Sequence, residues 1–364
     1  MRVTALEAAY PHWSGFANPS SWQSHLWQIV VRVDTDVGVS GYGYGGGGSA
    51  GVAVVNSHLR ELLLGRAVDS ANDIAEIYAA LSFALLPYRG GIAQMALSGV
   101  DLALWDLLGQ AERQPVYQLL GGSARQVRAY ATSGDIELAA AHGYTAMKLS
   151  HHGSNTVGNS GESAAEAAKG EDAVEAALAA ARQVLGDQAD LMVDCYLSWD
   201  AEMAERMAKR LAPYRVRWFE DVLTPDHLEE LAALRLRVAP VQLAGGEHEM
   251  TEAGFARAAA AGNGAGAFDV WQPDITWCGG ISAGLRILNL ARPSGTPVIP
   301  HRGGEPWGLH FIVATDCKQL AETMPERWQP GADELWLGES IVADGVIKPT
   351  DAPGFGVALN EELL

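Results

Sequence analysis

The sequence predicts an α/β fold in which a (β/α) barrel is joined to an α+β capping domain. Strand-like segments followed by helical segments fill roughly the first 120 residues, which is typical of a separate α+β unit. After about Val127, short apolar runs alternate with alanine-rich amphipathic segments, as in a parallel α/β sheet. Charged residues end these apolar runs at steps of 26 or 27 residues, the length of one strand, one helix and two short loops. That step is the repeating unit of a barrel.

The first unit contains two recognisable strands and three helical segments. Leu26 to Val33 is apolar and β-branched, and Asp36-Val37-Gly38 supplies a turn before Val39 to Tyr44. From about Val52, small and apolar residues recur at three- and four-residue steps, which predicts helices. We therefore predict an α+β capping domain over residues 1–122 and a barrel over residues 123–335.

The glycine-rich stretch Gly41–Gly46 formally matches the dinucleotide fingerprint GxGxxG. It belongs to a hairpin region and not to a strand-to-helix turn, so the match is weak. Because glycines permit hinging, we expect a mobile cap loop that closes over the barrel mouth.

Composition excludes several classes of partner. The net charge of −19 would repel nucleic acids and anionic membranes. The N-terminus lacks the pattern of a signal peptide, and no apolar run is expected to span a bilayer. The three cysteines are odd in number and widely spaced, which fits a reducing, cytoplasmic setting.

The most informative feature is the residue that follows each predicted barrel strand. Five successive apolar runs end at Asp194, Glu220, Glu247, Asp274 and His301. Barrel enzymes keep their chemistry at the C-terminal ends of their strands, so these side chains would crowd one mouth. Crowded carboxylates repel one another unless a cation neutralises them, and carboxylate oxygens suit Mg²⁺. A single acid at a strand end is more often a helix N-cap, but several in one register are hard to obtain from capping alone.

At these residues the sequence resembles the enolase superfamily, in its mandelate racemase-like branch. The resemblance also covers Ser98–Gly109, Pro115–Gly122 and Pro353–Val357. It implies a modified, enolase-like TIM-type barrel, with residues 336–364 returning to the cap. It further implies Asp194, Glu220 and Glu247 as ligands of Mg²⁺, His301 as the general base, Asp274 as its partner, and Glu322 as a contact to a substrate carboxylate oxygen or an acid.

Within this branch the sequence looks most like L-rhamnonate dehydratases, at Gly246–Glu249, Trp271–Asp274 and Met147–Gly153. Many members place two lysines one residue apart on the second barrel strand, whereas here Lys148 is followed at that spacing by Ser150. A racemase needs bases on both faces of the reacting carbon, while a dehydratase can work with one His–Asp pair. Lys148 would then be a positive contact near the substrate carboxylate or the metal, and not the main base.

The expected activity is dehydration of a small carboxylate sugar. His301 would remove the proton next to the carboxylate, and the resulting enediolate would expel the β-hydroxyl to give a 2-keto-3-deoxy acid. The alternatives are a racemase, epimerase or cycloisomerase on the same scaffold, or a non-catalytic barrel protein. The family also suggests a homo-oligomer. Candidate substrate contacts are His25, His152, Arg302, Glu305 and Trp307, although His25 and His152 are also consistent with packing or solvated loops.

Overall fold

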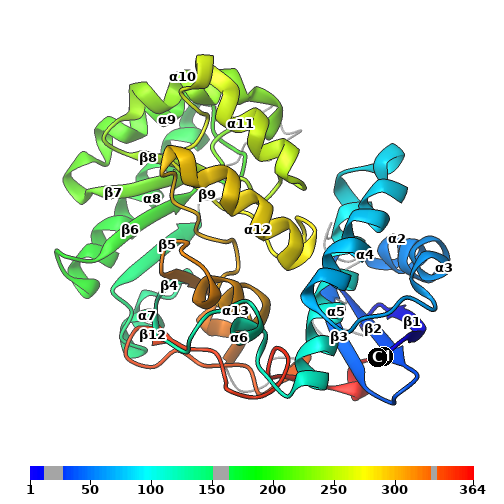
Figure 1. The fold of residues 1–364 in the computed structure, drawn as a ribbon. Coiled ribbons are helices and arrows are strands. Elements are labelled where there is room, and N and C mark those ends of the chain that lie inside the picture. Colours follow the sequence, from blue (N-terminus) through cyan, green and yellow to red (C-terminus); the bar gives the residue numbers. More distant parts are fainter. Residues whose placement is uncertain (12–27, 151–163, 329–333) are drawn as a thin grey trace.

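The computed structural model describes residues 1–11, 28–150, 164–328 and 334–364. These residues form a cap built on a small antiparallel sheet and a curled parallel sheet surrounded by helices (Figure 1). The predicted fold class, a barrel with an α+β cap, is confirmed. The division at residues 122 and 335 stays a prediction.

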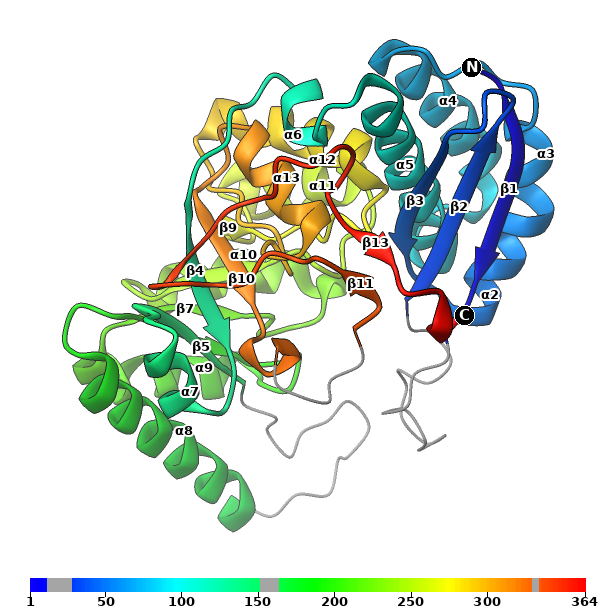
Figure 2. The same ribbon diagram turned by 90° about the horizontal axis from the view of Figure 1, so that it is seen from below.

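The cap sheet has the order β1-β2-β3, and helices cover one of its faces (Figure 2). Its strands are antiparallel and are β1 (Val3–Ala9), β2 (Ile29–Thr35) and β3 (Ser40–Gly45). Its helical segments are α2 (Gly48–Ala53), η2 (Val54–Leu59), α3 (Arg60–Leu63), α4 (Ala71–Ala84), η3 (Leu86–Tyr88), α5 (Gly91–Glu112) and α6 (Val116–Leu119).

The expectation of a mobile loop at Gly41–Gly46 is wrong. These residues form most of β3, and the strand packs directly on α5. A Cβ atom at Gly41 would lie 2.3 Å from the carbonyl oxygen of Ala103, and one at Gly43 would lie 2.0 Å from that of Gly99. The glycines are therefore explained by close approach of two backbones.

α5 is the central helix of the cap. It is long and apolar enough to cross a membrane, contrary to the expectation that no apolar run has that property. However, 83% of its apolar window is buried inside the protein. Helix α5 is accordingly a core helix, and its length reflects packing against β2 and β3.

The barrel strands are parallel and follow the chain in the order β4 to β9, with β10 paired to β4. They are β4 (Val127–Thr132), β5 (Ala146–Ser150), β6 (Asp190–Asp194), β7 (Val216–Glu220), β8 (Gln242–Gly245), β9 (Val270–Trp271) and β10 (Leu320–Thr323). The helices between and after them are α7 (Ile136–Ala141), α8 (Ala164–Leu185), α9 (Ala201–Arg210), α10 (Leu228–Val238), α11 (Glu252–Gly264), α12 (Gly280–Ala291) and α13 (Pro306–Ala314). Three short 3-10 turns adjoin these helices, namely η4 (Ala212–Tyr214), η5 (Pro225–His227) and η6 (Arg292–Ser294), and a fourth, η7 (Pro325–Trp328), follows β10.

The strand expected at Pro297–Pro300 is present only as isolated bridges. Val298 lies between β9 and the start of β10, because the Trp271 amide donates to the Pro297 carbonyl at 2.9 Å and the Lys318 amide donates to that of Val298 at 3.0 Å. Two prolines in four residues remove the amide donors that a full ladder needs. These two hydrogen bonds still connect β9, through residues 297 and 298, to the segment that leads into β10.

The C-terminal segment runs from the barrel to the cap (Figure 2). It contains β11 (Trp336–Leu337), β12 (Val346–Ile347), β13 (Ala358–Leu359) and η8 (Glu361–Leu363). Buried Asp106 of α5 fixes it: its Oδ1 accepts from the Phe355 amide at 3.0 Å and its Oδ2 accepts from the Tyr42 amide of β3 at 2.9 Å.

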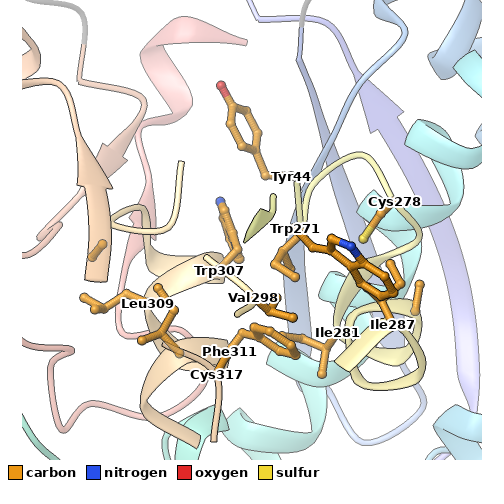
Figure 3. Packing of buried hydrophobic residues seen from close by; sticks show 14 of the residues in the cluster. Tyr44, Trp271, Cys278, Ile281, Ile287, Val298, Trp307, Leu309, Phe311 and Cys317 are labelled. Carbon is orange, nitrogen blue, oxygen red and sulfur yellow. The ribbon is translucent and has the colours of Figure 1, made fainter. Parts of the chain in front are cut away.

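The boundary between cap and barrel is packed with aromatic side chains. Trp307 contacts Tyr44 of β3, with ring centroids 6.2 Å apart, and Trp336 of the C-terminal segment at 5.1 Å. Figure 3 shows Tyr44 and Trp307 in one cluster with barrel residues such as Val298 and Phe311. The cap and the barrel therefore share one hydrophobic core.

Candidate active site

The interior of the barrel is closed by a layer of buried side chains, one from each strand and one from residue 299, which follows the bridge at Val298. These residues are Tyr130, Ala146, Met192, Trp218, Ala244, Val270, Ile299 and Leu320. Side chains two residues further along a strand point to the same face, so the next layer also faces inward. That layer contains Thr132, Lys148, Asp194, Glu220, Gln272, His301 and Glu322.

Lys148 is the centre of an ionic cluster in this second layer. Its Nζ lies 3.3 Å from Oδ2 of Asp194 and 2.8 Å from Oε1 of Glu322, and it also donates to Oε1 of Glu220. Burial acts to lower the pKa of Lys148, but the three carboxylates raise it well above its ordinary value. Lys148 is therefore a fixed positive charge.

Glu322 is held as an anion. Its Oε1 also accepts from the Thr132 hydroxyl at 2.5 Å, and its Oε2 accepts from the Arg302 amide at 2.7 Å. Burial acts to raise its pKa, but the charges of Lys148 and His301 and the hydrogen bonds from Lys148 and Thr132 together lower the pKa to about 2.

The other oxygens of Asp194 and Glu220 are held by neutral donors. The Tyr196 amide donates to Oδ1 of Asp194 at 3.0 Å. Oε2 of Glu220 accepts from the Trp218 indole at 3.0 Å and from the Gln272 amide at 2.7 Å. Both carboxylates are oriented by contacts that leave their remaining oxygens beside Lys148.

The predicted base and its partner form a direct pair. Nδ1 of His301 lies 2.8 Å from Oδ2 of Asp274, and the two residues occupy a parallel β-bridge. Oδ1 of Asp274 accepts from the amide and the hydroxyl of Thr276, at 2.6 Å and 2.7 Å. Burial acts to raise the pKa of Asp274, but its bonds to His301 and Thr276 lower it. An ionised Asp274 fixes the Nδ1–H tautomer of His301.

Glu247 connects this pair to the carboxylates. It lies one residue beyond the inward register, after Gly246, whose φ of 119° is favoured by glycine. Its Oε2 is 3.3 Å from Nε2 of His301, and its Oε1 is 3.4 Å from Nε2 of His248. Burial acts to lower the pKa of His301, but Glu247 and Asp274 raise it to about 10.

The structure therefore divides the three predicted metal ligands. Asp194 and Glu220 meet at Lys148, whereas Glu247 lies with the histidines. Within the part of the chain that is described, the compact group of ligand atoms, all within 4.8 Å of one another, comes from Asp221, Glu247 and His248.

The donor set nevertheless fits Mg²⁺. The described site holds six buried or nearly buried carboxylates, of which three contact the Lys148 ammonium and three contact His248 or His301; they are those of Asp194, Glu220, Asp221, Glu247, Asp274 and Glu322. Burial raises the pKa of Glu220 to about 8 and that of Glu247 to about 7, because ionised carboxylates lack sufficient counter-charge there. A hard divalent cation with oxygen ligands would supply that charge.

The predicted substrate contacts lie in three different settings. Arg302 and Glu305 are buried and form an ion pair, with Nη2 of Arg302 2.7 Å from Oε1 of Glu305, and they line a small cavity with Glu322. Trp307 is 1% exposed and packs in the shared core, where it presents no surface to a ligand. His25 and His152 lie outside the described residues.

Three residues that support the site were not predicted from the sequence. Thr132 and Gln272 support Glu322 and Glu220, and Thr276 supports Asp274. Thr132 and Gln272 follow core residues by two positions, so the inward register would have found them. Thr276 lies beyond β9 and carries no such signal.

A buried His–Asp pair, a buried ammonium and a carboxylate cluster at the C-terminal ends of barrel strands are typical of one class of protein, the barrel enzymes that perform acid–base chemistry beside a divalent cation. Residues 134–363 match the family described as enolase C-terminal domain-like, and residues 20–121 match the N-terminal domain of the mandelate racemase / muconate lactonizing enzyme family. The chain belongs to the enolase superfamily, in this family, as its sequence resemblance indicates.

Individual relatives include dehydratases. An L-rhamnonate dehydratase from Saccharopolyspora erythraea is 34% identical over 344 residues, covering 92% of this chain and 84% of that protein. The structure of L-talarate dehydratase from Polaromonas, complexed with Mg and L-glucarate, has a TM-score of 0.80 and 25% identity over 100% of this chain and 96% of that one. The prediction of an enzyme related to the hydro-lyases of this superfamily is confirmed.

Another similar structure is a racemase from Streptomyces coelicolor with bound magnesium, with a TM-score of 0.82 and 27% identity over 99% of this chain and 98% of that one. Two of these related structures thus contain magnesium, which confirms the prediction of a magnesium-dependent family.

Proposed function

We propose that this protein is a magnesium-dependent dehydratase of sugar acids of the L-rhamnonate class. The main support is the convergence of the His301–Asp274 pair and the Lys148 ammonium on one cluster of carboxylates. The L-rhamnonate dehydratase relative supports the substrate class.

We assign proton removal to His301. Its Nδ1–H is committed to Asp274, so in the neutral ring Nε2 carries the free lone pair. The negative charge of Glu247 contributes most to raising the pKa of His301. Neutralisation of Glu247 by a proton or a cation therefore lowers the pKa of His301. Once His301 has taken the proton α to the substrate carboxylate, ionised Asp274 stabilises the imidazolium.

We assign charge stabilisation to Lys148, with Asp194, Glu220 and Glu247 as the residues that would hold the metal. Magnesium, when bound there, supplies positive charge that offsets these carboxylates and the second negative charge of an enediolate. Lys148 adds a fixed charge on the same side, and Glu322 holds its ammonium in place.

Elimination completes the reaction. The enediolate electrons form the carbon–carbon double bond while the bond from the β-carbon to its hydroxyl oxygen breaks. Protonated His301 returns its proton to this hydroxyl, so that water leaves and the enol product tautomerises to a 2-keto-3-deoxy acid. One His–Asp pair can perform both proton transfers if the two groups lie on one face of the substrate.

The test is a screen of mono- and diacid sugars with purified protein and Mg²⁺, using semicarbazide to detect 2-keto acids. We expect a 2-keto-3-deoxy product from L-rhamnonate or a close stereoisomer, and no product in EDTA. If no sugar acid in the library yields a keto acid, the proposal is wrong.

A second candidate is a racemase or epimerase, since one similar structure is a racemase. The presence of Ser150 where many family members have a second lysine argues against it. Incubation in D₂O separates the two: a racemase returns substrate deuterated at the α-carbon in both configurations, without a keto acid.

The cellular setting and assembly remain proposals of the same kind. Cys195, Cys278 and Cys317 are free and buried, which is consistent with a cytoplasmic location. Homo-oligomerisation stays a prediction, which light scattering of the purified protein would test.

A further inference from the structure

We propose that Gln28 of the cap is a positioning residue for the His301–Asp274 pair, so that the cap orients the base of the barrel. This inference rests on the proposed function and assigns a role to a residue outside the barrel. Gln28 directly precedes β2 and is only 1% exposed.

Gln28 contacts both residues that hold the pair. Its Nε2 donates to the Thr276 hydroxyl at 3.0 Å, and its Oε1 accepts from the Trp277 indole at 3.0 Å. Thr276 in turn donates to Asp274, and the Trp277 ring lies against the His301 ring, with centroids 5.4 Å apart and planes tilted by 50°.

The chemical groups determine which atom is the donor and which the acceptor in each of these hydrogen bonds. An indole N–H can only donate, so the amide oxygen of Gln28 must face Trp277 and its NH₂ group must face Thr276. The Thr276 hydroxyl receives that donor and therefore directs its own proton to Oδ1 of Asp274. Oδ2 of Asp274 remains for Nδ1–H of His301.

The contacts form a closed ring of five residues: Gln28, Thr276, Asp274, His301 and Trp277. Two members of the ring contact the imidazole directly: Asp274 through a hydrogen bond and Trp277 through its aromatic ring. The ring limits rotation of the Asp274 carboxylate and of the imidazole together. A buried hydrogen-bond network in which these polar groups have partners favours a single arrangement of its side chains.

Other bonds tie the same barrel segment to the cap but do not reach the pair. Gln94 of α5 donates to the Cys278 carbonyl at 3.0 Å, and the Gly279 amide donates to the Ser98 hydroxyl at 2.8 Å. Gln94 is buried like Gln28 and links the same two parts of the protein. The chain thus provides a matched control for Gln28.

The experiment compares Gln28→Met, Thr276→Val and Thr276→Ser with Gln94→Met. Methionine keeps the length of glutamine without its hydrogen bonds, and serine keeps the hydroxyl that valine lacks. We expect Gln28→Met and Thr276→Val to lower kcat for dehydration by about tenfold or more, with KM changed by less than about threefold, because misoriented bases lose rate more than binding. Thr276→Ser retains kcat, and Gln94→Met lowers the melting temperature while kcat stays within about twofold.

The double variant Gln28→Met/Thr276→Val should lose less than the product of the two single losses, since both break one ring. The inference is overturned if Gln28→Met lowers kcat no more than Gln94→Met does. It is also overturned if the loss of kcat in the double variant equals the product of the losses in the two single variants.

A second readout does not depend on turnover. The proton between His301 and Asp274 should give a downfield proton NMR signal, identified by its absence in His301→Asn. We expect Gln28→Met to shift or broaden this signal and Gln94→Met to leave it in place. If the wild type dehydrates no sugar acid, the proposed function fails, while an unchanged signal in Gln28→Met contradicts the positioning role itself.

Discussion

The imidazole of His301 and the carboxylate of Asp274 meet at 2.8 Å across a parallel β-bridge, although neither residue lies within a regular strand. They end successive barrel units, so the fold itself brings them into contact. The chemistry proposed for this protein depends on that pair.

Replacement of His301 by asparagine should lower kcat by about 10²- to 10⁴-fold, the usual contribution of a general base. Exchange of the substrate α-proton with solvent deuterium should fall in parallel. The measurement is keto-acid formation together with NMR of recovered substrate. Dehydration at the wild-type rate would rule out His301 as the base.

Loss of Lys148 should destabilise the metal-free protein. Lys148→Met leaves three buried carboxylates without their common cation, and breaking a buried ion pair costs about 3–5 kcal/mol. We expect a lower melting temperature in EDTA and loss of turnover. Lys318→Met, at an exposed lysine, is the control, and equal melting temperatures of the two variants would contradict this account.

Removal of the metal should be measurable without substrate. Mg²⁺ at a hundred times its dissociation constant stabilises a protein that binds it only when folded by about 2.7 kcal/mol. The wild type should therefore melt at a higher temperature as Mg²⁺ is raised, and EDTA should reverse the change. Glu220→Gln should show a much smaller response, whereas a full response would remove Glu220 from the ligand set.

Gln272 should tune metal affinity through Glu220. Its amide donates to Oε2 at 2.7 Å, and loss of such a supporting contact typically weakens metal binding by about 10- to 100-fold. Titration calorimetry of Gln272→Leu with Mg²⁺ measures the effect. Gln110→Leu, a half-buried glutamine of the cap, should bind Mg²⁺ as the wild type does.

Asp101 should make stability depend on pH. Burial in the cap raises its pKa from 3.8 to about 7, although it accepts two hydrogen bonds from Ser282. A raised folded-state pKa means that the folded state binds more protons, so stability falls as pH rises from about 4 to 7. The melting temperature of Asp101→Asn relative to wild type should therefore rise across this range. Asp187→Asn, at an exposed carboxylate, is the control, and a difference independent of pH would refute the prediction.

The sequence determined the architecture because it carries periodic signals. The alternation of apolar runs with alanine-rich amphipathic segments predicted the parallel sheet and its helices, and the steps of 26 and 27 residues placed Asp194 and Glu220 at the ends of β6 and β7. These signals are local, because the strand period of two and the helix period of 3.6 are properties of adjacent residues. The two prolines at 297 and 300 were equally readable, yet their effect on the ladder was overlooked.

Only the tertiary structure decided which groups meet. Nothing local indicated that Lys148 would take three carboxylates as partners, that Glu247 would face the histidines, or that Trp307 would be buried against Tyr44. Gln28 is separated from Thr276 by 248 residues, and its contact exists because cap and barrel share one core. Such long-range pairings depend on how the strands and layers pack together, and a pattern that repeats along the chain contains no record of that packing.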